Sequence, residues 1–214
     1  MQIEKNMTKK ITFIVLTLIL VFGCNQAEKY EKELEIAFEK KIESELNSGI
    51  RNDTIFLGYT LGMNKKEFSK KTNELRKEKK LYVNNESTLA YKMTIDDNAF
   101  GKDLEATFSP EYYNEKLFKL GVSVKPTKYS SPELTQLQLV RLFNDKYGLY
   151  DHFEKSILET TNNYYWIDGN RQIEVVCGFN DARIFYTDLL AEKESDTNKE
   201  LEQEKELNKT KSDL

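Results

Sequence analysis

His152 is the only histidine among the 214 residues and therefore the first candidate for acid–base or metal chemistry. It lies in the segment Tyr150-Asp151-His152-Phe153-Glu154, just after the end of an expected helix. A histidine-based zinc site needs a second histidine, and a catalytic base needs a group that orients it. The sequence around His152 shows neither, so we interpret it as a surface or partly packed residue.

A second candidate is the acidic group formed by Asp96, Asp97 and Asp103 in a polar loop. A calcium loop carries oxygen ligands at alternating positions, as in D-x-D-x-D-G, and this loop lacks that spacing. The chain also lacks the G-x-S-x-G, G-x-x-x-x-G-K and G-x-G-x-x-G motifs. We therefore expect no metal and no cofactor. A hydrolase in which Asp96, Asp97 or His152 converge in space stays open as an alternative class of function.

Two aromatic groups, Tyr112-Tyr113 and Tyr164-Tyr165-Trp166, are the candidate binding residues. Tyr and Trp make good contact anchors in protein interfaces, whereas cross-strand aromatic pairing is the alternative explanation for them. Alternation along a strand sends Tyr165 and Trp166 to opposite faces of a sheet. We expect Trp166 to be the core residue because it is the larger ring to bury, and we hypothesise that Tyr165 is the exposed anchor.

The N-terminal segment has the layout of a secretory signal, with either Met1 or Met7 as its start. Lys9 and Lys10 precede the run 11–23, which contains 13 residues without a charge. As a helix this run would span about 20 Å, against roughly 30 Å for the hydrocarbon core of a bilayer. It is too short to remain as a transmembrane helix, and a small residue ends it, as a cleavable signal requires.

The end of this run, Val21-Phe22-Gly23-Cys24, resembles the lipobox of bacterial lipoproteins. The resemblance implies that residues 1–23 are removed and that the Cys24 thiol carries lipid, palmitate included. It also implies a body anchored to the cell membrane or the outer membrane and located in the periplasm or outside the cell. An ordinary secretory signal that contains a cysteine is the alternative.

The second cysteine, Cys177, is then the only free thiol of the processed chain, so an intramolecular disulfide is not expected. It alternates with Ile173, Val175 and Phe179 on one face of a predicted strand. A reactive thiolate needs a histidine or a positive neighbour, and none is adjacent in sequence. We interpret Cys177 as a small buried apolar residue.

Charge limits the class of partner. The formal net charge is -4, and removal of residues 1–23, which carry Lys5, Lys9, Lys10 and Glu4, leaves -6. Nucleic-acid binding depends on a basic face that neutralises phosphates, so nucleic acid is an unexpected partner. With 12 Tyr, 12 Phe and 32% charged residues, the chain suits a globular body better than a disordered or multi-span one.

Apolar periodicity predicts three helices, over residues 27–46, 64–80 and 132–148. Asn64 and Glu67 form a capping-box pattern at the start of the second, with Met63 and Phe68 as a hydrophobic staple. Strand-like segments are 54–62, 87–95, 103–109, 116–125, 164–167, 171–179 and 182–189. One helix followed by three strands thus occurs twice, which predicts an α+β fold with an antiparallel sheet and helices on one face.

This duplicated order over residues 54–190 resembles the β-lactamase-inhibitor-like lipoproteins. Three features carry the likeness: Gly62-Met63 opening one helix, Lys146-Tyr147-Gly148 closing the next, and Trp166 ahead of an Ile-rich strand. The resemblance implies helices packed on one face of an antiparallel sheet. It also implies a role as an inhibitor or a small envelope-assembly lipoprotein.

We expect four segments: a lipoprotein signal peptide at 1–23, the lipidated Cys24 and a tether helix at 24–52, an α+β domain at 53–190, and a charged mobile tail at 191–214. The expected function is a membrane-anchored, non-catalytic binding or scaffold module of the cell envelope. Its expected partners are the lipid bilayer, through acylated Cys24, and an envelope protein. An inhibitor or immunity-type protein is the alternative.

Replacing Cys24 with Ala should move the protein from the detergent phase to the aqueous phase on phase separation, because the apolar run alone cannot span a bilayer. Mass spectrometry of the wild-type N-terminus provides the control, since it should show an acylated Cys24. A Cys24→Ala protein that is still cleaved after Gly23 and still acylated would contradict the lipobox interpretation.

Overall fold

The computed structural model describes residues 29–95, 102–126, 132–156, 161–178 and 181–212. The chain divides into two compact units, Met1–Ile42 and Glu43–Leu214. In the first unit, residues 29–42 are helical. In the second, residues 43–47 are helical and are followed by a turn in which Gly49 has a φ of 70°. The expected signal peptide and Cys24 lie outside the described residues. No helix in the described part of the chain is both long and apolar enough to cross a membrane.

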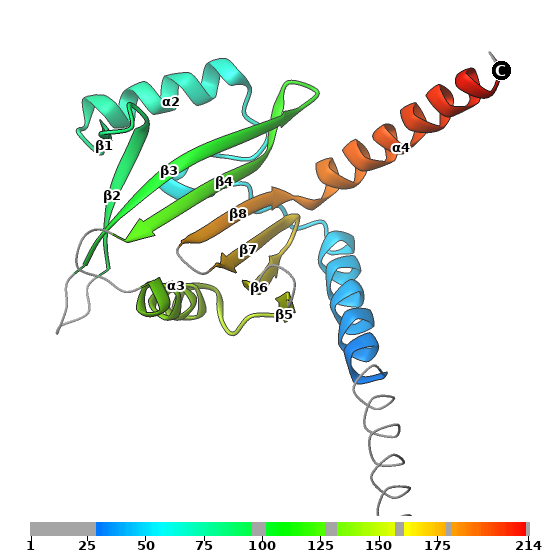
Figure 1. Cartoon of the computed structure of the whole chain (residues 1–214), viewed down its shortest axis with the longest axis horizontal. Helices are drawn as coiled ribbons and strands as arrows, with labels where there is room; N and C mark the ends of the chain where they lie inside the picture. Colours follow the sequence, from blue (N-terminus) through cyan, green and yellow to red (C-terminus); the bar gives the residue numbers. More distant parts are fainter. Residues whose placement is uncertain (1–28, 96–101, 127–131, 157–160, 179–180, 213–214) are drawn as a thin grey trace, which may run out of the picture. The chain divides into compact units, whose positions relative to one another are not determined.

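The second unit is built on an eight-stranded antiparallel sheet with the strand order β1-β2-β3-β4-β8-β7-β6-β5 (Figure 1). Its elements, in chain order, are the 3-10 turn η1 (Phe56–Gly58), α2 (Lys65–Lys77), β1 (Leu81–Val83), β2 (Leu89–Ile95), β3 (Lys102–Tyr113), β4 (Lys116–Pro126), α3 (Pro132–Tyr147), β5 (His152–Ser156), β6 (Thr161–Asp168), β7 (Arg171–Cys177), β8 (Ala182–Asp188) and α4 (Leu189–Ser212). The α+β prediction is confirmed.

The predicted duplication is present and more complete than expected. One helix followed by four antiparallel strands occurs as α2 with β1–β4 and again as α3 with β5–β8. The final strands of the two halves, β4 and β8, pair from Lys119↔Thr187 to Val124↔Ala182 and join the halves into one sheet. The outer strands β1 and β5 were missed, because runs of three and five residues carry too little alternation to be recognised.

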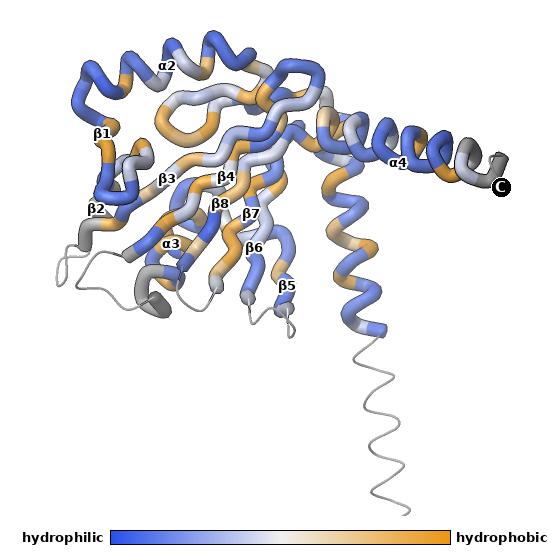
Figure 2. Tube along the Cα trace, turned by 45° about the horizontal axis from the view of Figure 1, so that its top comes forward, coloured by the Kyte–Doolittle hydropathy of each residue, from blue (hydrophilic) through white to orange (hydrophobic). Residues whose placement is uncertain are grey.

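One face of the sheet forms the core, because buried apolar residues occupy every second position of neighbouring strands. Hydrophobic residues lie along β3, β4 and β7 in the trace coloured by hydropathy (Figure 2). Leu104, Val122, Ile184, Val175 and Trp166 on this face are all 2% exposed or less. Both α2 and α3 pack against it. The ring of Phe143 in α3 lies 5.5 Å from that of Trp166, and Phe68 in α2 stacks 4.5 Å from Tyr59. Helices α2 and α3 therefore cover one face, as predicted.

The start of α2 follows the sequence prediction in atomic detail. The Asn64 side chain accepts a hydrogen bond from the Glu67 amide at 2.9 Å, and the Glu67 carboxylate accepts one from the Asn64 amide at 2.7 Å. This capping box satisfies two amides that the helix leaves unpaired. The helix ends at Lys77 rather than near Lys80, because Lys79 adopts a φ of 57°.

The strand predicted over residues 54–62 was wrong. This segment turns through η1, where Leu57 has a φ of 53°, and the chain returns on itself so that Thr54 bridges Thr60. The turn brings Phe56 and Tyr59 against the same core face, where their rings lie 5.8 Å and 6.2 Å from that of Phe108. Burial of two rings three residues apart therefore overrides a β-like composition.

Two further differences concern helices. Leu137 lies in the apolar pattern that predicts α3 but is 67% exposed, whereas Leu139 and Phe143 face the core. Residues 191–214, expected to form a charged mobile tail, belong largely to helix α4. Its first turns contact the face of the sheet opposite the core, where Glu192 pairs with Lys119 of β4 at 3.6 Å, and Ser195 is 4% exposed.

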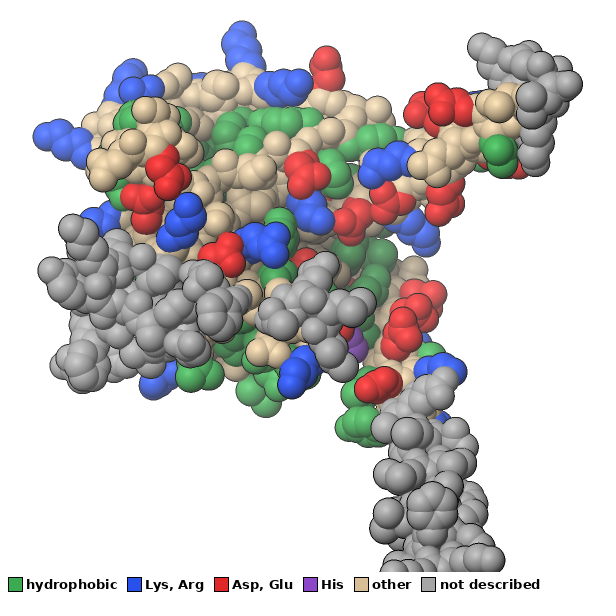
Figure 3. Space-filling model, in the orientation of Figure 1, with side chains coloured by type: hydrophobic (Ala, Val, Ile, Leu, Met, Phe, Trp, Pro, Cys, Tyr) green, Lys and Arg blue, Asp and Glu red, His purple; other side chains and the backbone are tan. Residues whose placement is uncertain are grey.

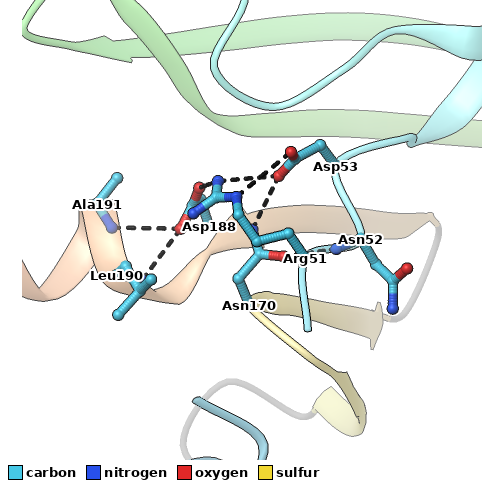
Figure 4. Close-up of polar contacts among 7 residues, drawn as sticks. All are labelled: Arg51, Asn52, Asp53, Asn170, Asp188, Leu190 and Ala191. Atoms are coloured by element: carbon cyan, nitrogen blue, oxygen red, sulfur yellow. Dashed lines mark hydrogen bonds and ion pairs between the residues drawn. The ribbon is translucent and has the colours of Figure 1, made fainter. Parts of the chain in front are cut away.

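A polar clamp around the buried residues Asn170 and Asp188 joins the segment before η1, the β6–β7 turn and the start of α4 (Figure 4). Asn170, 1% exposed, accepts from the Asn52 amide at 2.7 Å and donates to Asp53 at 3.0 Å. The guanidinium of Arg51 donates to Asp53 and Asp188, each at 2.9 Å. The other Asp188 oxygen accepts from the amides of residues 190 and 191 in the first turn of α4. These contacts satisfy the buried amide and carboxylate groups of the clamp.

Replacing Phe143 with Ala should lower the free energy of unfolding by about 3 kcal/mol or more, through lost burial and the cavity left beside Trp166. The matched control is Leu137→Ala on the same helix, which should cost less than about 0.5 kcal/mol because that side chain is exposed. Urea denaturation of both variants measures the difference. Equal losses would contradict the orientation of α3 described above.

Candidate functional site

A cavity of about 560 Å³ lies between α3 and the adjoining strands β6 and β7. We call it the α3 groove. Its walls are Gln136, Leu137, Val140, Arg141, Asn144 and Asp145 from α3, Asn162 and Tyr164 from β6, and Cys177 from β7. The volume falls in the range of pockets that receive a small ligand or a few side chains of a partner.

Helical and strand periodicity explain why these residues meet. Val140 and Asn144 are one helical turn apart and lie on the flank of α3 that faces β6. Asn162 and Tyr164 are two residues apart, so both point to the core face of the sheet. At one end of the groove the Gln136 amide donates a hydrogen bond to the Gly178 carbonyl, which connects α3 to the end of β7.

One polar atom of the groove has no partner among the described residues. The side-chain oxygen of Asn144 is buried and accepts no hydrogen bond there. A buried acceptor left without a donor costs free energy, on the order of 1–3 kcal/mol. A ligand that brings a hydrogen-bond donor to this helix flank would remove that cost, provided the amide turns toward it.

Beside the groove lies an aromatic ledge formed by Tyr150, Phe153 and Tyr164. The Tyr164 ring centre is 5.2 Å from that of Tyr150 and 5.1 Å from that of Phe153. Tyr150 and Phe153 are each 40% exposed, and the preceding Leu149 is 82% exposed. Because Tyr164 also lines the groove, the two features form one continuous surface. Burial raises the pKa of Tyr164, so its hydroxyl stays protonated near neutral pH.

Trp166, a candidate from the sequence, lies in the core and is 2% exposed. Its indole N–H donates to the Gly148 carbonyl at 2.9 Å, which ties β6 to the end of α3. Trp166 is therefore a core residue and not a binding residue, because almost none of its side chain is exposed to solvent. Residues 164–167 of β6 pair with residues 172–175 of β7, the next strand-like segment along the chain.

Tyr165 lies on the opposite face from Trp166, as the period of two predicts. It is half-buried, and its hydroxyl donates to Glu154 at 3.1 Å. Burial raises the pKa of Tyr165. Its role as a contact anchor stays a prediction, and the structure does not bring it to the α3 groove.

Tyr112 and Tyr113 belong to the β3–β4 hairpin and point to opposite faces. Tyr112 packs edge-on against Phe68 of α2 at 6.3 Å. The Tyr113 hydroxyl lies 3.4 Å from the carboxylate of Glu194 in α4. Both side chains thus contact helices of the same chain. They lie on β3, which does not line the α3 groove.

The structure describes only some of the residues considered for chemistry. His152 lies on β5, its ring 5.7 Å from that of Tyr165, whereas Asp96 and Asp97 lie outside the described residues. Cys177 is 3% exposed, and burial raises its pKa to about 12, so the thiol is protonated at neutral pH. Among the residues that the structure describes, no three His, Cys, Asp or Glu side chains are grouped to hold a metal ion.

Sequence reasoning missed Tyr150 and Phe153. Both stood in the segment quoted around His152, but without β5 there was no strand to place Phe153 opposite Tyr164. The pattern that could have revealed them is an aromatic residue on each of two neighbouring strands, here Phe153 and Tyr164. The exposed pair Leu149-Tyr150 comes just before the first of these strands.

The opposite face of the sheet carries partly buried charges in a row across the strands. Glu174 of β7 lies opposite Tyr165, and Lys119 of β4 lies over the Phe185 ring at 5.2 Å. Burial raises the pKa of Glu174, although a hydrogen bond from Tyr165 and the charge of Lys119 act against that shift. Burial likewise raises the pKa of Glu192, opposed by Lys119. The charged form of each carboxyl is therefore less favourable in the folded chain than in water.

Comparison of the chain with protein-family models, with curated proteins and with solved structures gives no match. The functional argument therefore depends on the geometry above.

Because of Glu174, the protein should gain stability as the pH falls from neutral to mildly acidic values. A carboxyl whose pKa is higher in the folded than in the unfolded chain contributes stability below the unfolded pKa and loses it as pH rises through the folded pKa. A Glu174→Gln variant stays neutral at all pH values and can still accept from Tyr165. It should melt at a higher temperature than wild type at pH 7.5 and at the same temperature near pH 4.

Thermal melts between pH 4 and pH 8 test this expectation. Glu200→Gln on α4 is the control, since that side chain is exposed. A Glu174→Gln protein that melts below wild type at pH 7.5 would contradict a net cost of the charged form.

Proposed function

We propose that this chain is a non-catalytic binding module of the cell envelope that captures a protein partner through the α3 groove and the aromatic ledge. One observation carries the proposal: a cavity of about 560 Å³ opens beside two aromatic rings that are each 40% exposed. Aromatic side chains beside a pocket that excludes water are the usual source of binding energy at protein interfaces.

The composition of this surface favours a polypeptide as the occupant. The ledge offers flat apolar rings, and the groove adds side-chain amides and the buried Asn144 oxygen. A peptide segment matches both, because it carries an apolar side chain for the ledge and backbone N–H donors for the amide oxygens. Leu137 in the wall of the groove and Leu149 beside the ledge are exposed and add apolar contact area.

Membrane anchoring fits the same proposal. The lipobox-like sequence ending at Cys24 supports attachment to the cell membrane or the outer membrane. A lipid anchor restricts the body to the neighbourhood of other envelope proteins, which raises their effective concentration at the groove. At this raised concentration the groove can be occupied even if its intrinsic affinity for the partner is modest.

Truncating both Tyr150 and Phe153 to Ala should reduce capture of the partner at least 10-fold, because interface aromatics of this kind contribute about 2 kcal/mol or more. The measurement is photo-crosslinking in intact cells from a probe at Leu149, followed by mass spectrometry. The matched control is Tyr82→Ala, a tyrosine with the same 40% exposure on β1, at the far edge of the sheet. It should leave capture unchanged.

A second variant tests the groove itself. Val140→Trp places a large ring in the cavity and should block capture while the protein stays folded, as judged by circular dichroism. Capture that persists at wild-type level in both the ledge variant and the groove variant would refute this surface as the binding site.

A further inference from the structure

Helix α2 and the three residues that follow it, Glu78, Lys79 and Lys80, differ in charge from the rest of the chain. Between residues 65 and 80 there are eight basic residues and three acidic ones, a net charge of +5, in a chain whose net charge is -4. The basic residues are Lys65, Lys66, Lys70, Lys71, Arg76, Lys77, Lys79 and Lys80. The acidic balance of the whole chain therefore conceals one strongly basic element.

The helical geometry separates these charges by face. Phe68, Thr72 and Leu75 point toward the core, with Leu75 2% exposed. At 100° per residue, the arc from Lys65 through Lys66 to Lys70 contains five basic side chains and no acid. Its full membership is Lys65, Lys66, Ser69, Lys70, Asn73, Arg76 and Lys77, all of them exposed. We call this arc the basic face of α2.

The acidic residues in and just after α2 lie outside the basic face, and two of them already have hydrogen-bond or ion-pair partners. Glu67 and Glu74 are two helical turns apart, beyond one edge of the basic face. The Glu67 carboxylate is occupied by the capping box, and Glu78 pairs with Lys80 at 2.8 Å. The lysines at 66, 70 and 77 therefore face solvent without an acid on their own face. Figure 3 shows Lys and Arg side chains projecting along the α2 side of the molecule.

We propose that the basic face of α2 docks on a bilayer that contains anionic phospholipids. The face is a convex row on one helix, about 16 Å long between Lys66 and Lys77. Flexible lysines on a convex surface suit a fluid, laterally mobile layer of headgroups, since no fixed ligand geometry is needed. Each basic side chain near an anionic surface strengthens binding by about fivefold.

The surroundings of α2 favour a bilayer over a nucleic acid. Lys65 lies over the Tyr112 ring at 5.5 Å, which places the β3–β4 hairpin beside the start of the helix. That hairpin exposes Glu111 and Glu115. A duplex, which extends beyond the helix in both directions, would approach these carboxylates, whereas mobile lipids can redistribute away from them.

The test uses the full chain with Cys24→Ala in every arm, so that acylation does not dominate binding. Partition is measured by flotation with vesicles of phosphatidylcholine alone and vesicles containing 30% phosphatidylglycerol. Wild-type α2 should favour the anionic vesicles, and 0.5 M salt should remove that preference by screening. The triple variant Lys66→Gln, Lys70→Gln, Lys77→Gln should bind the anionic vesicles about 100-fold more weakly.

Two further variants distinguish charge on this face from charge in general. Lys66→Arg, Lys70→Arg, Lys77→Arg should retain binding. Lys193→Gln, Lys199→Gln, Lys205→Gln makes the same charge change on exposed positions of α4 and should change binding less than threefold. Equal partition into neutral and anionic vesicles, or equal losses in the α2 and α4 variants, would overturn the proposal. Displacement from vesicles by an equimolar 20-base-pair DNA duplex would also overturn it.

Discussion

The polar clamp around Asn170 and Asp188 is the interaction on which the rest of this architecture depends. Asn170 connects the β6–β7 turn to Asp53, and Asp188 joins the end of β8 to both Arg51 and the first amides of α4. The turn itself requires Gly169, since a Cβ there would lie 2.5 Å from the Ile50 carbonyl oxygen. Removing one member would leave buried groups without partners, which costs more than the bond itself contributes. Three segments distant in sequence are thereby held at one end of the sheet.

The sheet then separates two chemical environments. Its core face is covered by α2 and α3, and the space that α3 leaves beside β6 is the α3 groove. Its other face carries Glu174 and Lys119, with Glu192 of α4 nearby. The two surfaces proposed to bind partners belong to different helices of the duplicated fold: the groove to α3 and the basic face to α2. Duplication thus supplied two similar scaffolds whose helices differ in side-chain chemistry.

Much of the fold could be predicted from local chemistry. The Asn64 capping box depends only on residues close together in sequence. The same holds for the strand alternation that places Tyr165 and Trp166 on opposite faces of the sheet. The segment 54–62 could not be predicted, because its turn is set by burial of rings against distant strands. The groove escaped prediction for a related reason, since α3 has apolar residues on several sides and only tertiary packing selects which face inward. The basic face of α2 was missed because net charge was considered over the whole chain rather than per element.

The seam between β4 and β8 has a consequence for how the chain folds. Within each half, neighbouring strands are consecutive in sequence, so their loops close at low entropic cost, whereas Lys119 and Thr187 are separated by most of the second half. During synthesis the first meander emerges with the edge of β4 unpaired until β8 has been made. An open strand edge is a template for another chain. Exchange of β8 between two copies would therefore compete with correct closure, and a concentration-dependent, domain-swapped dimer is the misfolded product that this topology favours.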